Sequence, residues 1–283
     1  MTTPTTHASH AEKAALRRQA ALLILLGIVG AVAVLPYAFA LQADTLARVV
    51  ATKGTSLVVL GLASAAQTTV LVVVSVVAGL WAARRVGLQA PVTAAVARGE
   101  PAWPVLRPVL VPALAAGAVS GAAVVLLDAF VFNPLLPELR ALGSAVTAGP
   151  SAWKAALACL YGGFTEEILC RLFLLGVLAL GLLGLARALR LAGDAERARW
   201  GALIVANVLA ALLFGALHLP ATAVLMKLTP LVVTRALVLN GLVGLACGFL
   251  YLRRGLEAAM AAHLTADVVL HILTPLLAQG LHS

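Results

Sequence analysis

Two adjacent carboxylates and an arginine lie inside a stretch that is otherwise almost wholly apolar from Ala155 to Ala186. A charged side chain near the centre of a membrane helix costs about 2.5 to 3.5 kcal/mol on insertion scales, so Glu166, Glu167 and Arg171 need partners, water or both. On a helix, Glu167 and Arg171 are four residues apart and can pair, whereas Glu166 points about 100° away. The spacing predicts one neutralised carboxylate and one that is free for chemistry.

Polar residues at four-residue spacing recur in two later apolar runs. Phe214 and His218 share a helix face in the first of these runs, and His263 and Asp267 share a face in the second. An unpaired glutamate, two histidines and a second acid can hold and deprotonate a water and stabilise an oxyanion. The candidate catalytic residues are Glu166, His218, His263 and Asp267. The predicted supporting residues are Glu167, Arg171 and Phe214.

Other polar residues in the apolar runs have structural interpretations. His271 extends the face of His263 and Asp267 by another four residues, and it is expected to face the polar interior. Asp128 lies near the end of the third apolar run and is predicted to be solvated or to cap a helix. Cys170 is interpreted as a small apolar residue.

Composition favours an integral membrane protein. The chain has 283 residues, of which 62% are hydrophobic and only 11% are charged, whereas soluble domains carry about 25% charged residues. The net charge of +9 comes from basic residues in short clusters between apolar runs, without an aromatic-interleaved patch, so nucleic acid is not an expected partner. Three cysteines, all in apolar runs and without CxxC spacing, indicate neither a disulfide framework nor a cysteine metal site.

The expected fold is all-α and polytopic, with about seven transmembrane helices and a cytoplasmic N-terminus. The apolar runs are residues 20–41, 56–81, 108–132, 154–186, 200–218, 230–252 and 256–277. Most are near the ~20 residues that cross ~30 Å of hydrocarbon. The fourth is too long for one crossing and is predicted to continue as an extended or bent helix around its glycines. Basic residues concentrate in alternate connections, which sets the orientation by the positive-inside rule.

The sequence suggests three segments along the chain. Residues 1–19 are expected to be a disordered cytoplasmic tail, residues 20–150 the N-terminal transmembrane helices, and residues 151–280 a catalytic helical core. The longest non-apolar connections are residues 89–108 and 133–151, and the prolines of the first predict a connection that lies on the surface.

Three motifs together resemble those of the CPBP (Abi) family, which includes CAAX prenyl proteases and bacteriocin-processing enzymes. They are Glu166-Glu167-x-x-x-Arg171, Phe214-x-x-x-His218 and His263-x-x-x-Asp267, and the resemblance covers residues 155–273. It implies that Glu166 is the general base that activates water and that His218 helps to hold this water. It also implies that His263 and residue 267 polarise the scissile carbonyl or line the oxyanion site, while Glu167 and Arg171 brace the helix.

The sequence departs from the family pattern at one position. The third motif often ends in asparagine, which donates a hydrogen bond, whereas Asp267 can only accept one when it is ionised. Asp267 is therefore protonated, orients His263, or binds a metal.

Metal dependence stays open at the level of sequence. Glu166, His218, His263 and Asp267 are a plausible ligand set for Zn²⁺ with an open position for water. The HExxH motif is absent, however, and a carboxylate base in a desolvated site can do the same chemistry without a metal. We favour the metal-free account and keep Zn²⁺ as the alternative.

The resulting functional hypothesis is an intramembrane endopeptidase in a bacterial inner membrane. It would cleave a membrane-anchored or small peptide substrate in a water-filled cavity between the fourth, fifth and seventh spans. One alternative is a non-catalytic scaffold or bacteriocin-immunity protein with the same fold. Another is a proton-coupled transporter, since buried acids and histidines also form proton relays, although no inverted repeat is evident. Helix lengths leave open which side of the membrane the cavity faces.

Overall fold

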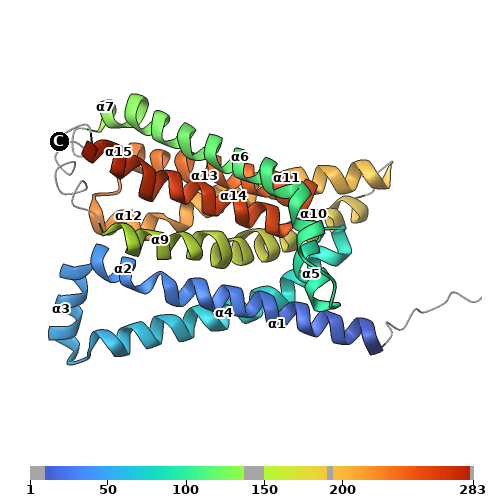
Figure 1. Cartoon of the computed structure of the whole chain (residues 1–283). Helices are drawn as coiled ribbons and strands as arrows, with labels where there is room; N and C mark the ends of the chain where they lie inside the picture. Colours follow the sequence, from blue (N-terminus) through green and yellow to red (C-terminus); the bar gives the residue numbers. More distant parts are fainter. Residues whose placement is uncertain (1–9, 137–149, 190–193, 281–283) are drawn as a thin grey trace, which may run out of the picture.

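The computed structural model describes residues 10–136, 150–189 and 194–280, and this part of the chain is helical without strands. Seven helical segments are long and apolar enough to cross a membrane, and they run roughly side by side (Figure 1). They are His10–Leu41, Leu57–Val86, Trp103–Leu135, Ala152–Ala188, Ala195–Leu225, Pro230–Arg254 and Leu256–Ala278. The prediction of an all-α polytopic membrane protein is confirmed, and each predicted run overlaps one of these segments.

The first span begins earlier than its apolar run indicates. Helix α1 (His10–Ala33) includes residues 10–19, which were expected in the disordered tail. This stretch is rich in alanine, leucine, lysine, arginine, glutamate and glutamine, the strongest helix formers, so polarity alone did not prevent helix formation. Residues 1–9 lie outside the described part of the chain.

A short helix, α3, connects the first two spans at one end of the bundle. Helix α2 (Leu35–Leu41) continues α1, and α3 (Ala43–Lys53) leads to α4 (Leu57–Val86) (Figure 1). The side chain of Ser56 accepts a hydrogen bond from the Val59 N–H and caps the start of α4. This cap satisfies one of the backbone donors that the first turn of a helix leaves free.

The connection at residues 89–108 lies at the surface as predicted in its second part, where Pro101, Pro104 and Pro108 are exposed, but its first part is buried. It contains α5 (Pro91–Ala97), which crosses one end of the bundle and packs against α1 and α14 (Leu256–Val268) (Figure 1). Thr93 explains the burial, because its backbone N–H and its hydroxyl both donate to Glu257 Oε1, at 2.8 and 2.9 Å. These bonds tie α5 to the start of α14.

The third span comprises α6 (Trp103–Leu127), the π-helical η1 (Asp128–Phe132) and α7 (Asn133–Leu135). Asp128 is neither simply solvated nor a cap, because Arg235 donates two hydrogen bonds of 2.6 Å to its two carboxylate oxygens. This bidentate pair joins the third span to α13 (Pro230–Arg254). Most of the connection expected at residues 133–151 lies outside the described residues.

The fourth span is one continuous helical run of 37 residues, as its length predicted. It consists of α9 (Ala152–Leu160), η2 (Tyr161–Glu166), η3 (Ile168–Leu175) and α10 (Gly176–Ala188). The two η segments are π-helices, so the helix is wide on both sides of Glu167. Such stretches are rare and occur frequently at functional sites.

The last three spans pack tightly against one another and against the fourth. Helices α11 (Ala195–Leu217) and α13 pack so closely that a methyl group at Gly248 would overlap Asn207 Oδ1, so glycine is needed at this crossing. Asn207 also donates to the Leu245 carbonyl at 3.2 Å. The chain between them contains α12 (Leu219–Leu225), and α14 continues as the π-helical η4 (Val269–Leu273) and α15 (Thr274–Gly280).

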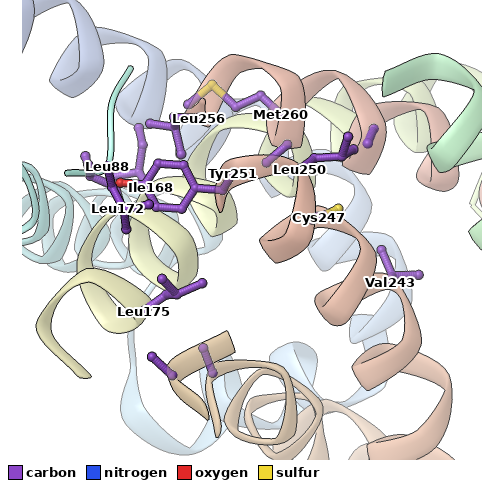
Figure 2. Close-up of a cluster of buried hydrophobic side chains, with 14 of the residues drawn as sticks. Leu88, Ile168, Leu172, Leu175, Val243, Cys247, Leu250, Tyr251, Leu256 and Met260 are labelled. Carbon is purple, nitrogen blue, oxygen red and sulfur yellow. The ribbon is translucent and has the colours of Figure 1, made fainter. Parts of the chain in front are cut away.

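An apolar core fills the space where these spans meet. Figure 2 shows Tyr251 of α13 among Leu88, Ile168 and Leu172, and all four side chains are buried. Large apolar side chains on the outward helix faces are exposed instead, including Val58 at 69% and Val119 at 70%. Inward packing and outward apolar exposure together suit a helical bundle surrounded by lipid.

Candidate active site

The candidate residues come from three spans. Glu166 ends η2 and Glu167 follows it, His218 lies directly after α11, and His263 and Asp267 lie in α14. Helix α14 packs against η2, and η3 packs against α11. The elements that carry the three sequence motifs are therefore neighbours in the fold.

His263 is the centre of the cluster. Its Nδ1 lies 2.7 Å from Glu167 Oε1, and the same carboxylate oxygen lies 3.2 Å from Arg171 Nη1. All three side chains are buried, with exposed fractions of 4%, 0% and 2%. Because an ionised carboxylate can only accept, the His263 Nδ1–H donates to it. The structure thus places the supporting pair Glu167 and Arg171 together, and it adds a contact that the sequence did not reveal, with Glu167 fixing the ring of His263.

The opposite edge of the His263 ring faces the other two acids. His263 Nε2 is 3.7 Å from Glu166 Oε2 and 3.7 Å from Asp267 Oδ1. These separations exceed hydrogen-bond range. Glu166 and Asp267 are also more exposed than Glu167, at 19% and 13%. The Nε2 edge of the ring therefore faces the two less buried carboxylates.

His218 is connected to this cluster through an aromatic ring. The edge-to-face contacts of Phe214 bring its centroid to 4.7 Å from that of His218 and 5.5 Å from that of His263. The Arg171 guanidinium lies 4.6 Å from the Phe214 centroid. His218 Nδ1 is 2.8 Å from the Phe214 carbonyl oxygen, to which it donates when protonated, so Nε2 is the other edge of its ring. Among the described residues, His218 forms no hydrogen bond or ion pair with Glu166, His263 or Asp267.

Glycine at position 162 makes the close approach of η2 and α14 possible. A methyl group there would overlap Asp267 Oδ2 and would lie 3.3 Å from His263 Nε2. At Gly163 a methyl group would lie 3.0 Å from Leu264 Cβ. The Gly-Gly pair before the glutamates therefore brings the Glu166 helix against the helix that carries His263 and Asp267.

The structure groups metal-binding residue types differently from the sequence-based set. Among the described residues, the donor atoms of Glu167, Cys247 and His263 all lie within 4.8 Å of one another. The set Glu166, His218, His263 and Asp267 does not form such a group. Cys247 was not a predicted site residue. The only feature of the sequence that could have indicated it is its place in a run of small residues on α13.

The grouped residues do not fit a bound Zn²⁺ well. Glu167 is already paired with the guanidinium of Arg171, and the same carboxylate holds His263 Nδ1. A divalent cation in this place would lie close to the buried positive charge of Arg171, and their repulsion is strong in a medium of low dielectric constant. We therefore derive no catalytic step through a metal.

Comparison with known families gives a match over residues 148–269, to the family described as Type II CAAX prenyl endopeptidase Rce1-like. The matched segment contains Glu166, Glu167, Arg171, Phe214, His218, His263 and Asp267. Comparisons with curated proteins and with solved structures gave no match. The resemblance indicated by the three motifs is thus confirmed, and residues 148–269 match the type II CAAX prenyl endopeptidase family.

Proposed function

We propose that this protein is an intramembrane endopeptidase that hydrolyses a peptide bond of a membrane-anchored or small peptide substrate. The arrangement of His263 is the main support, because Glu167 holds its Nδ1 and its Nε2 faces Glu166 and Asp267. The family match supports the same class of reaction, since the family is one of prenyl endopeptidases.

In the proposed reaction Glu166 is the general base. Its carboxylate takes a proton from a water, and the water oxygen forms a bond to the carbonyl carbon of the scissile peptide. The carbonyl oxygen becomes an oxyanion, which accepts a hydrogen bond from Nε2–H of His263 in its doubly protonated form. The C–N bond then breaks, and the proton held by Glu166 passes to the leaving nitrogen. No atom beyond those of water and substrate is consumed.

Glu167 acts on this reaction through His263. It fixes one ring nitrogen, so the other points toward the reacting groups, which is the role of a carboxylate behind a catalytic histidine. This positioning differs from the sequence-based alternative in which Asp267 orients the ring. Asp267 instead lies beside Nε2, where it adjoins the oxyanion position or the water.

In the proposed site, His218 lies on the α11 side of the attacking water. Phe214 contacts both histidine rings, so His218 approaches the reaction centre from the α11 side while its Nδ1 is occupied by a backbone carbonyl. Its Nε2 is the atom that would contact water or substrate.

The proposal needs no metal, because Glu166 and His263 supply the base and the oxyanion donor. Cleavage by the purified protein is expected to persist after chelation. Inactivation that a single divalent ion reverses, with one ion bound per chain, would favour the Zn²⁺ alternative instead.

The test compares newly formed peptide termini in membranes that carry the wild type, Glu166→Gln or His263→Ala. Mass spectrometry of these membranes is expected to show termini that depend on the wild type and that fall at least tenfold with either substitution. Cys170→Ala is the matched control, because Cys170 is buried in the same helix and has no role in the proposed reaction. If both variants are present in the membrane at wild-type amounts and produce the same termini as the wild type, the proposal fails.

A further inference from the structure

Exposure along the helix that carries His263 rises in one direction. Glu257, near the first residue of α14, is buried, and His263 is 4% exposed. Asp267 is 13% exposed, and His271, four residues farther in η4, is exposed. The three residues from His263 onward follow one another at four-residue spacing, so they lie along one side of the helix. The site therefore becomes more accessible toward the C-terminal end of this span.

The other end of the same span is closed by α5. Thr93 donates to Glu257, and the Leu256 N–H donates to the Gln89 carbonyl at 3.0 Å. Gly255, which joins α13 to α14 with a φ of 93°, is so close to Pro91 that a methyl group on it would overlap the proline ring. These contacts place α5 across the start of α14.

An apolar layer lies between this closed end and His263. It comprises the buried residues Leu88, Ile168, Leu172, Tyr251, Leu256 and Met260 (Figure 2). Met260 is three residues before His263, so the layer begins directly beside the site. Two cavities of about 240 and 530 Å³ lie at this end, and neither is lined by a candidate catalytic residue.

Tyr37 and His271 mark the accessible end. Their rings meet edge to face with centroids 6.0 Å apart, which brings α2 of the first span against η4 of the last. A histidine that faced lipid at this depth would be costly, whereas a histidine that lines a wet passage keeps its hydration. The contact with Tyr37 places His271 between the two spans.

The two ends of the bundle differ strongly in charge. The closed end, where α5 lies, carries many more basic residues than the end where α3, α12 and α15 lie (Figure 1). Those at the closed end are Lys13, Arg17, Arg18, Arg84, Arg85, Arg98, Arg107, Arg187, Arg197, Arg199, Arg253 and Arg254. Those at the accessible end, among the described residues, are Arg48, Lys53, Lys154, Lys227 and Arg235, and Arg235 is paired with Asp128. By the positive-inside rule the closed end faces the cytoplasm.

We propose that the substrate reaches Glu166 and His263 from the non-cytoplasmic face, through a mouth formed by Tyr37 and His271. This inference rests on the proposed function for the identity of the reaction. It specifies the substrate class as a membrane-anchored peptide segment whose scissile bond lies on the exported side. The path runs from His271 past Asp267 to His263.

The test labels single introduced cysteines with a membrane-impermeant maleimide in right-side-out and inverted membrane vesicles. His271→Cys is expected to react in right-side-out vesicles, and Arg254→Cys, an exposed residue at the closed end, only in inverted vesicles. The unmodified chain is the background control, since Cys159, Cys170 and Cys247 are 2%, 3% and 0% exposed. Tyr37→Cys replaces His271→Cys if that variant does not accumulate in the membrane.

Each labelling outcome decides the inference without any activity measurement. Reaction of His271→Cys or Tyr37→Cys only in inverted vesicles overturns it, as does protection of both from either side. A second readout is the formation of new peptide termini by the labelled protein. A bulky maleimide on the mouth cysteine is expected to lower their formation at least tenfold, while the same label on Arg254→Cys leaves it unchanged.

If labelling follows the expected pattern but Glu166→Gln leaves the termini unchanged, the access path stands and the proposed function fails. If Glu166→Gln abolishes the termini but the mouth cysteine reacts from the cytoplasmic face, the function stands and the inferred direction is wrong.

Discussion

At the scale of single residues, the site depends on how one imidazole is held. His263 is bound at one nitrogen by Glu167, whose charge is balanced by Arg171, and its other nitrogen faces Glu166 and Asp267. Truncating one member of a buried ion pair leaves a buried charge without a partner, which typically costs about 3 to 5 kcal/mol. The adjacent glutamates thus differ in their surroundings, since Glu167 is buried and paired, whereas Glu166 is partly exposed and is the proposed base.

Gly162 provides the most specific test at this scale. In Gly162→Ala, the new methyl group would overlap the Asp267 carboxylate, so Asp267 and His263 must shift. We expect cleavage to fall at least tenfold and stability to fall by about 1 to 3 kcal/mol, as is typical of overpacking. Formation of peptide termini and thermal inactivation in detergent measure the two effects.

Gly181→Ala is the matched control for this substitution. Gly181 lies in the same span, and a methyl group there would contact no atom within 4 Å. Alanine favours a helix over glycine by up to about 1 kcal/mol, so this variant should be as stable as the wild type or more stable. If Gly162→Ala and Gly181→Ala lose equal activity, the loss does not come from the displacement of Asp267, and the prediction is contradicted.

At the scale of elements, the position of α14 depends on α5. The carboxylate of Glu257 accepts two hydrogen bonds from Thr93, and Gln19 of α1 donates to the Thr93 hydroxyl and to the Ala90 carbonyl. These contacts fix the start of α14. His263 lies in the same helix, six residues after Glu257. A short helix in a connection therefore helps to set the depth of His263.

Thr93→Val tests this connection because valine keeps the shape of threonine but removes its hydroxyl. The backbone N–H bond to Glu257 remains, while one carboxylate oxygen loses a buried donor. We expect a loss of stability of about 1 to 3 kcal/mol, measured as earlier thermal inactivation. Thr93→Ser retains the hydroxyl and should lose much less. If Thr93→Val is as stable as the wild type, or if only Thr93→Ser loses stability, the methyl group and not the hydroxyl hydrogen bond is what matters.

Much of the helical architecture could be predicted from the sequence, because apolar runs of membrane length leave few alternatives to spanning helices. The pairing of Glu167 with Arg171 also followed from their four-residue spacing. The contact of Glu167 with His263 did not, since it joins residues far apart in the chain. Nor did the burial of α5, because the connection that contains it has several prolines, and because the partner of Thr93, Glu257, lies 164 residues away in the chain.

At the scale of the whole molecule, seven candidate spans and one strongly basic end predict an orientation. An odd number of crossings places the two ends of the chain on opposite sides of the membrane. From the basic residues at the end where α1 begins, we expect the N-terminus to lie in the cytoplasm. The same asymmetry gives the accessible end of the site its direction.

Protease protection of terminal tags checks this orientation. With tags added at both ends, a protease applied to spheroplasts is expected to remove the C-terminal tag and to leave the N-terminal tag intact. Inverted vesicles should give the reverse pattern. Removal of both tags from the same side would mean an even number of crossings, and one of the seven segments would then not span.

The wide turns on both sides of Glu167 also affect how this chain can vary in length. A π-helical turn holds one residue more than an α-helical turn, so each stretch can lose a residue without any change in the loops beyond it. We expect a deletion there to be absorbed by tightening of the helix, with the remaining six spans in place. Loss of a residue between Ile168 and Cys170, in η3, would rotate Arg171 relative to Glu166. A natural relative shortened by one residue in this stretch would therefore be inserted into the membrane and folded, yet inert as a protease.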